Sequence, residues 1–188
     1  MMTVRETIEQ RRAYRSLDPI AVSEELIADL AGAASLAPSC MNNQPWRFIF
    51  ITQSELLQRI HPALSSGNHW AQSAAMIIAV CSKPDLDCQI KGRDYYWFDT
   101  GMAVAFLILR ATELGLIAHP IAGYDEAKVK AVVDLPADMT LITLVMVGKH
   151  STAINPALSE NMKKGELNRP ERLPLADIAF RERYSESK

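Results

Sequence analysis

The loop from Ala37 to Trp46 carries a group of side chains that can bind a small ligand. Its sequence is APSCMNNQPW, and four residues between its two prolines offer hydrogen-bonding side chains: Ser39, Asn42, Asn43 and Gln44. The prolines restrict the backbone and discourage the preceding helix from continuing. Polar loops between regular elements often bind ligands. An ordinary connector is the alternative interpretation.

A cluster of arginines lies near the start of the chain, at Arg11, Arg12 and Arg15. Arg11 and Arg15 are four residues apart, so both side chains can face the same side and hold a phosphate with their planar sets of N–H donors. The alternative is a solvated helix end, where the helix dipole favours cations. A second concentration of cations, Arg169 and Arg172, lies far along the chain.

Several common catalytic motifs are absent from the sequence. It contains neither G-x-G-x-x-G nor G-x-x-x-x-G-K-[ST], so no dinucleotide-binding crossover and no P-loop are predicted. The four histidines follow no metal-ligand spacing, and no metal site is expected. No G-x-S-x-G motif marks a nucleophilic serine.

Composition limits the class of protein. The chain has 188 residues, of which 48% are hydrophobic, enough for one domain with a substantial core. The net charge of -2 gives no general field that would attract nucleic acid or an acidic membrane. Three cysteines, Cys40, Cys81 and Cys88, argue against a disulfide-rich scaffold, with Cys81 expected in the core. With no signal-peptide pattern and no apolar run long enough to span a bilayer, we expect a soluble, cytoplasmic protein.

Periodicity and capping residues predict an alternation of helices and strands. Helices are predicted over residues 3–12, 23–38, 55–60, 94–115 and 126–133, with strands over 46–52, 76–81 and 139–147 and an extended stretch over 116–123. Thr3, Ser23, Ser54 and Asp125 are the predicted N-caps. The helix over 94–115 is so apolar that it needs cover on most sides, and a partner subunit in a homodimer is one source. Residues 1–150 form a single predicted domain, followed by an extended arm, 151–188.

The order of these motifs resembles the FMN-dependent nitroreductase family. The resemblance is carried by R-R-x-x-R, then A-P-S-x-x-N-x-Q-P-W-R-F, D-T-G-x-A, E-L-G-L, P-I-x-G, and V-G-K-H followed by R-L-P. It covers nearly the whole chain, and its most specific part is the A-P-S run. It implies an α+β, three-layer fold with a central mixed sheet flanked by helices. It also implies a C-terminal arm that is exchanged in a homodimer.

The resemblance also implies an FMN site. Arg11 would bind the phosphate, and Arg15 would reach the pyrimidine edge of the flavin, where negative charge collects on reduction. Ala13 stands where the family usually has serine, which leaves only its backbone N–H for the phosphate. Further implied contacts are Arg12 beside Arg11, Arg172 at the phosphate, Ala122 and Gly123 beside the ring with a backbone N–H near N5, and Asn68.

The loop would contribute Pro38, Ser39, Cys40 and Asn42 to the same flavin, from the other subunit. This would make the loop half of a site that only a dimer completes. Cys40 would face the flavin pocket. It is interpreted either as a redox-sensitive thiol or as a tolerated small residue.

The implied activity is transfer of a hydride from NAD(P)H to FMN and then to a nitroaromatic, quinone or similar flat small-molecule acceptor, by a ping-pong mechanism. Because both substrates would stack in turn on one flavin face, no separate nucleotide-binding motif is needed, and no side chain need act as nucleophile. Two alternatives stay open. One is a specialised enzyme of the same fold, of the reductive dehalogenase or flavin-fragmenting type. The other is a non-enzymatic flavin-binding module.

Overall fold

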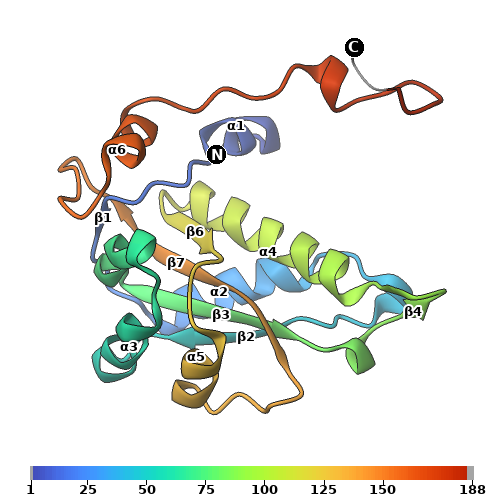
Figure 1. Ribbon diagram of the computed structural model, residues 1–188, viewed down its shortest axis with the longest axis horizontal. Helices are drawn as coiled ribbons and strands as arrows, with labels where there is room; N and C mark the ends of the chain where they lie inside the picture. Colours follow the sequence, from blue (N-terminus) through green and yellow to red (C-terminus); the bar gives the residue numbers. More distant parts are fainter. Residues whose placement is uncertain (1, 186–188) are drawn as a thin grey trace.

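The computed structural model describes residues 2–185, and a five-stranded sheet forms its centre (Figure 1). Its strands are β1 (Leu17–Asp18), β2 (Arg47–Ile51), β3 (Met76–Ser82), β6 (Ile117–Ile121) and β7 (Thr140–His150). Val147 of β7 aligns with Met76 on one side and with Ala118 on the other, so β7 lies between β3 and β6. β2 continues the sheet beyond β3, and β1 pairs with the end of β7.

The strand directions correct one expectation. The resemblance implies a mixed sheet, but every strand pair within residues 2–185 is antiparallel. β3 and β6 run in the same direction, and because β7 separates them, no two parallel strands are hydrogen-bonded to each other.

Helices cover both faces of the sheet, which gives the expected three layers. α2 (Glu24–Ser35) and α4 (Tyr96–Glu113) cover one face, and α3 (Ser54–Ile60) and α5 (Glu126–Val132) cover the other (Figure 1). Strand β3 is buried along its whole length. Successive side chains of a strand point to opposite faces. Met76, Ile78 and Val80 therefore pack with α2 and α4, and the alternate residues, Cys81 among them, pack with α3 and α5.

Most of the predicted helix starts are confirmed by side-chain caps. α1 (Val4–Gln10) begins with a capping box in which the Thr3 hydroxyl accepts from the Glu6 N–H and the Glu6 carboxylate accepts from the Thr3 N–H. Ser23 and Asp125 cap α2 and α5. Ser54 is a correction, since it is the first residue of α3 and the cap position is Gln53.

The connection from β3 to α4 contains a small hairpin, β4 (Gln89–Ile90) with β5 (Arg93–Asp94). Its two turn residues, Lys91 and Gly92, both have positive φ, as a tight two-residue hairpin turn requires. The hairpin lies at the N-terminal end of α4 (Figure 1). Short 3-10 helices occur at η1 (Cys40–Asn42), η2 (His61–Ala63), η3 (Ser66–Ser73), η4 (Pro84–Leu86) and η5 (Leu175–Asp177).

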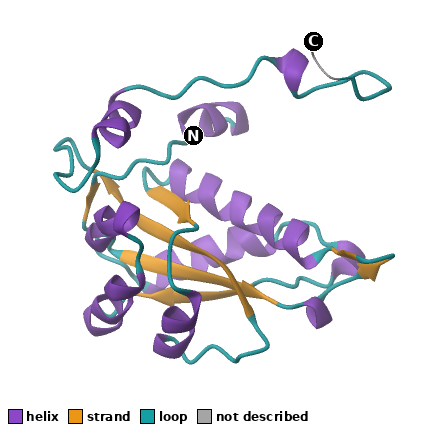
Figure 2. Cartoon of the chain, in the orientation of Figure 1, coloured by secondary structure: helices purple, strands orange, loops and turns teal. Residues whose placement is uncertain are grey.

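The arm that begins at residue 151 is not extended throughout. It contains a helix that the sequence analysis did not predict, α6 (Glu160–Leu167), which is capped by the Ser159 hydroxyl. Beyond α6 the chain runs away from the sheet (Figure 2), and residues 171–185 are all exposed, including Leu173, Leu175 and Tyr184. Within residues 2–185 there is no helix with the length and hydropathy needed to cross a membrane.

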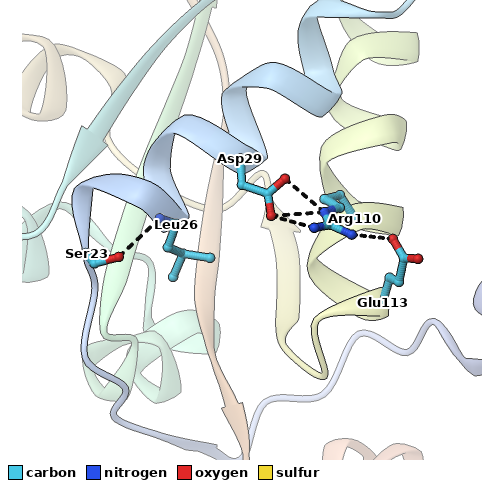
Figure 3. Close-up of polar contacts among 5 residues, drawn as sticks. All are labelled: Ser23, Leu26, Asp29, Arg110 and Glu113. Atoms are coloured by element: carbon cyan, nitrogen blue, oxygen red, sulfur yellow. Dashed lines mark hydrogen bonds and ion pairs between the residues drawn. The ribbon is translucent and has the colours of Figure 1, made fainter. Parts of the chain in front are cut away.

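An ion cluster joins the two helices on one face of the sheet. The Arg110 guanidinium of α4 donates to both carboxylate oxygens of Asp29 in α2, at 3.0 and 2.7 Å, and to Glu113 at 2.6 Å (Figure 3). These hydrogen bonds lower the pKa of Asp29 and raise the pKa of Arg110. The pair is partly exposed, so solvent screens part of its energy.

The Arg110→Met variant is expected to be less stable than wild type at pH 7. At pH 2 this difference in stability should be much smaller. Because the folded pKa of Asp29 is depressed, its ion pair stabilises the fold above the unfolded pKa of about 3.9, and this contribution is lost as pH falls through the folded pKa. Urea unfolding of both proteins across this range measures the difference. Arg59→Met, at an exposed side chain of α3, is the control. Equal stability of Arg110→Met and wild type at pH 7 would contradict the assignment.

Candidate functional site

Arginines from distant parts of the chain converge on one hollow of about 180 Å³. It is lined by Arg11, Arg12, Ala13 and Arg15 before β1, and by Gly165, Arg169, Pro170 and Arg172 of the arm. No acidic side chain is among these lining residues. Burial and the neighbouring Arg169, Arg172 and Arg12 lower the pKa of Arg11. Crowded cations need a compensating anion, and guanidinium groups match the oxygens of a phosphate. The lining therefore fits a phosphate group.

The two sides of the hollow are fastened together by polar contacts. The buried Glu166 carboxylate of α6 accepts from the backbone N–H groups of Arg15, at 2.7 Å, and Ser16, at 3.0 Å. Arg12 donates to the Gly165 carbonyl at 2.8 Å. Arg169 donates to the carbonyls of Glu9 and Arg11. Arg12 and Arg169 thus hold the arm in place, whereas Arg11 and Arg172 have no carbonyl partner among the described residues.

Replacing Glu166 by alanine is expected to destabilise the protein by about 3 kcal/mol, because two backbone N–H groups lose a charged hydrogen-bond acceptor. Chemical unfolding measures this loss. The matched control is Glu171→Ala, at an exposed position of the same arm, which should change stability little. If the two variants unfold alike, Glu166 does not fasten the arginine segment.

Aromatic contacts connect the arginine segment to the sheet. The Arg15 guanidinium lies over the Trp70 ring, 5.9 Å from its centroid, and Trp70 packs against His119 of β6 with centroids 4.7 Å apart. His119 Nδ1 donates to the Tyr14 carbonyl at 3.0 Å. Burial lowers the pKa of His119 to about 4, so this imidazole is neutral at pH 7 and adds no charge beside Arg15.

Gly123 and Asn68 lie in direct contact beyond this aromatic pair. The Asn68 side-chain amide donates to the Gly123 carbonyl at 2.9 Å, and the Ser65 N–H donates to the same oxygen at 3.0 Å. A Cβ on Gly123 would lie 2.4 Å from Ser65 Oγ and 2.7 Å from Asn68 Nδ2, so only glycine fits without displacing them. Ala122 is exposed beside this turn. The structure thus brings together three of the predicted site residues.

The predicted loop lies elsewhere in the same chain. Pro38, Ser39 and Cys40 line a second hollow of about 430 Å³ with Ile90, Tyr95, Phe98, Asp99 and Met102. Asn42 is exposed and is not part of this lining. The loop and the arginine segment lie at opposite ends of α4 (Figure 1). A single chain therefore does not bring the two predicted halves of the site together.

The loop holds a costly backbone conformation. Met41, Asn42 and Gln44 have φ values of 51°, 58° and 50°. Left-handed conformations at residues other than glycine cost on the order of 1–3 kcal/mol each and persist only where surrounding contacts enforce them. Here the Cys40 N–H donates to Asp99 at 2.6 Å, and the Gln44 N–H donates to the Ser39 hydroxyl at 2.9 Å.

A disulfide between Cys40 and Cys88 adds a covalent fastening to this loop. It corrects the interpretation of Cys40 as a tolerated small residue. The two cysteines are 48 residues apart in sequence, and both are held at the start of α4, where the Tyr95 N–H donates to the Cys88 carbonyl and the Cys40 N–H donates to Asp99. Cys81 lies in the core as predicted, where burial raises the pKa of its thiol to about 12. Cys40, Asp87 and Cys88 place potential ligand atoms within 4.8 Å of one another, but the disulfide occupies both sulfur atoms.

Comparison with known proteins identifies the family to which this chain belongs. The family model described as the nitroreductase family matches residues 8–69 and 64–149, most of the chain. The chain belongs to the nitroreductase family.

Relatives of this nitroreductase-family chain include two prokaryotic proteins with the provisional name NADH dehydrogenase/NAD(P)H nitroreductase. The chain is 34% identical over 128 residues to the protein of Stenotrophomonas maltophilia, an alignment that covers 57% of this chain and 65% of that protein, and so spans less than two thirds of its length. It is 30% identical over 145 residues to the protein of Archaeoglobus fulgidus, covering 75% of this chain and 82% of that one.

A solved structure described as an oxidoreductase containing FMN superposes with a TM-score of 0.83 and 27% sequence identity. The superposition covers 99% of this chain and 95% of that one. The α+β nitroreductase fold expected from the sequence motifs is thus confirmed over almost the entire chain.

Three residues of the site were not predicted to have a role in it. Arg169 was noted in the cationic run that includes Arg172, but it was not assigned to the site. For Cys88, the sequence offered no signal beyond the residue type. Glu166 lies in a helix of low hydropathy, a pattern that predicts a solvent-exposed carboxylate. In the structure its carboxylate is instead buried and accepts from backbone N–H donors.

Proposed function

We propose that the protein binds FMN and acts as an NAD(P)H-dependent oxidoreductase on a nitroaromatic, quinone or similar flat acceptor, by a ping-pong mechanism. Family membership supports this, as does the FMN named for the structural relative. The observation that carries the proposal is the convergence of arginines from residues 11–15 and 169–172 on one hollow with no acid in its lining.

The chain's own groups would bind and orient the cofactor. Arg11 and Arg172 bind the phosphate, together with the backbone N–H of Ala13 and with Arg12 beside them. Arg15, fixed over Trp70, offers a cation to the pyrimidine edge of the flavin. FMN, when bound, supplies the redox chemistry by taking a hydride from NAD(P)H and delivering two electrons to the acceptor.

The turn at Gly123 is the proposed contact surface for the flavin ring. Because Gly123 has no side chain and its carbonyl is held by Asn68 and Ser65, its backbone forms a flat, fixed edge beside exposed Ala122. In the proposed site the backbone N–H near N5 comes from this turn. No side chain acts as a nucleophile.

We further propose that the working unit is a homodimer in which the Pro38–Asn42 loop of one chain completes the arginine site of the other. The separation of these two halves along α4 supports this arrangement (Figure 1). A hollow of about 480 Å³ between α1, α2 and α4 is lined mainly by apolar residues, including Val4, Leu36 and Phe106. Val4 and Leu36 are 75% and 78% exposed, and so large an exposed apolar surface is typical of an interface. The exposed arm would be exchanged across it, and the cytoplasm is the proposed compartment.

The central proposal is tested on the purified protein. Reconstitution with FMN, followed by removal of free flavin, should leave a yellow protein with a flavin absorption band. Anaerobic NADH or NADPH should bleach that band, and nitroaromatic or quinone acceptors should restore it. Failure to retain FMN would overturn the proposal. Retained flavin that neither nicotinamide reduces would instead identify a binding module.

Arg11→Ala and Arg172→Ala are each expected to weaken FMN binding by about 1.5–3 kcal/mol, roughly 10- to 150-fold in Kd, because each removes a charged hydrogen-bond donor to the phosphate. Quenching of FMN fluorescence measures the affinity. Arg59→Ala removes the same charge from an exposed position of α3 and should leave Kd unchanged. Unchanged affinity in both hollow variants would remove the phosphate site.

Mixing two defective chains tests the shared site. The variant R11A/R172A lacks the phosphate hollow, and the variant S39A/N42A lacks the loop contacts, so each alone should retain little FMN. In a dimer of one chain of each kind, one site receives both intact halves, and random pairing should restore about a quarter of all sites. Flavin content after co-expression measures this. A mixture that binds no more FMN than its components would place the whole site within one chain.

A further inference from the structure

We propose that Cys40 and Cys88 form a reversible thiol–disulfide switch that controls the conformation of the loop from Pro38 to Gln44, and through it the retention of flavin. The second part of this inference rests on the proposed function. The first part, the reversible cross-link and its effect on the loop, does not.

The cross-link is placed where a reductant can reach it. Cys40 and Cys88 are both partly exposed, in contrast to Cys81, which is fully buried. Cys40 begins a 3-10 turn, and Cys88 precedes the small β4–β5 hairpin. Neither cysteine lies in the five-stranded sheet. Opening the disulfide therefore need not disturb the core.

The loop has a strained backbone conformation that the cross-link helps to maintain. Three of its residues, Met41, Asn42 and Gln44, have positive φ in a segment without glycine. Noncovalent contacts also hold the loop, among them the bonds from the Cys40 N–H to Asp99, from the Gln44 N–H to the Ser39 hydroxyl and from the Asn43 side-chain amide to Asp87. Without the covalent link, only such hydrogen bonds within the described residues oppose the relaxation of three strained residues.

The Asp87 carboxyl group beside the sulfur atoms favours an accessible reduced state. One oxygen of Asp87 accepts from the Cys88 N–H at 2.8 Å, while its other oxygen, Oδ2, is buried and has no hydrogen-bond donor other than a proton shared with Asp99. Asp87 also lies within 4.8 Å of both sulfur atoms. A disulfide has no proton to donate, whereas a thiol has one. The reduced form therefore adds a hydrogen-bond donor close to an acceptor that, in the oxidised form, has only the proton shared with Asp99.

Asp99 provides a second group suited to proton exchange at this place. It is buried, and its carboxylate accepts from the Cys40 N–H. Burial raises the pKa of Asp99, and the neighbouring Asp87 carboxylate raises it further. Asp99 and Asp87 can share a proton, and Asp87 is the member of the pair that lies near the sulfur atoms.

The switch uses ordinary thiol–disulfide exchange with a dithiol as the reductant. A thiolate of the dithiol attacks one sulfur of the pair, the Cys40–Cys88 bond breaks, and a mixed disulfide forms while the other cysteine leaves as a thiolate and takes a proton. The second thiol of the reductant, as its thiolate, then displaces the remaining cysteine, which also takes a proton. The protein gains two electrons and two protons, and the reductant becomes a cyclic disulfide.

Counting reactive thiols in the native protein tests the cross-link. Dithiothreitol should raise the count from none to two, and air or oxidised glutathione should return it to none. Cys81→Ala should show the same native counts, because the Cys81 thiol is buried. A count that the reductant does not change would overturn the switch.

Hydrogen exchange and flavin binding test its effect. Reduction, or the Cys88→Ser substitution, should speed amide exchange in residues 38–46 and weaken FMN binding by roughly tenfold, the change that corresponds to one lost hydrogen bond. Cys88→Ser leaves Cys40 and its proposed flavin contact in place. Loop exchange or FMN affinity that is unchanged by reduction would overturn the inference. If no form binds FMN, the proposed function fails, and loop exchange alone decides whether the switch exists.

Discussion

Strand β7 pairs with three other strands, and each pairing positions one part of the candidate site. β1 joins its end and brings in the arginine segment that precedes Leu17. β6 lies along one edge and delivers the Gly123 turn. β3 lies along the other edge and follows directly after η3, which holds Asn68 and Trp70. Since one-residue slips would exchange the two buried faces of these strands, the register of β7 is tightly specified.

The distribution of charge in this chain differs locally from its net charge. The protein as a whole is slightly acidic, yet the hollow at Arg11 collects five guanidinium groups. The fold tolerates this because Arg12 and Arg169 are bound by carbonyl oxygens, and because Glu166 binds backbone donors. Part of the cationic cluster thus holds the structure, and the remainder is left for an anion.

The sequence predicted the elements well because their signals are local. Caps such as Thr3 with Glu6, and the continuous apolar run of β3, depend on residues within a few positions of each other. Residue types and spacing pointed to Arg11 and Arg15, and the family resemblance implied Arg172; all three line one hollow. What could not be predicted depends on distant contacts. The partner of Cys40, the burial of Glu166 and the antiparallel pairing throughout the sheet are set by tertiary structure, and no local pattern encodes them.

The arginine hollow takes its residues from positions 11 and 172, which has a consequence for biosynthesis. A ribosome makes the sheet and all four of its covering helices before it reaches the arm. The hollow is therefore incomplete until the arm has been made, and the arm also supplies Leu158 to the core. Under the proposed function, cofactor loading becomes one of the last steps of maturation, because Arg169 and Arg172 are made late. Under the proposed function, only a chain that has been translated as far as Arg172 presents the complete hollow to FMN.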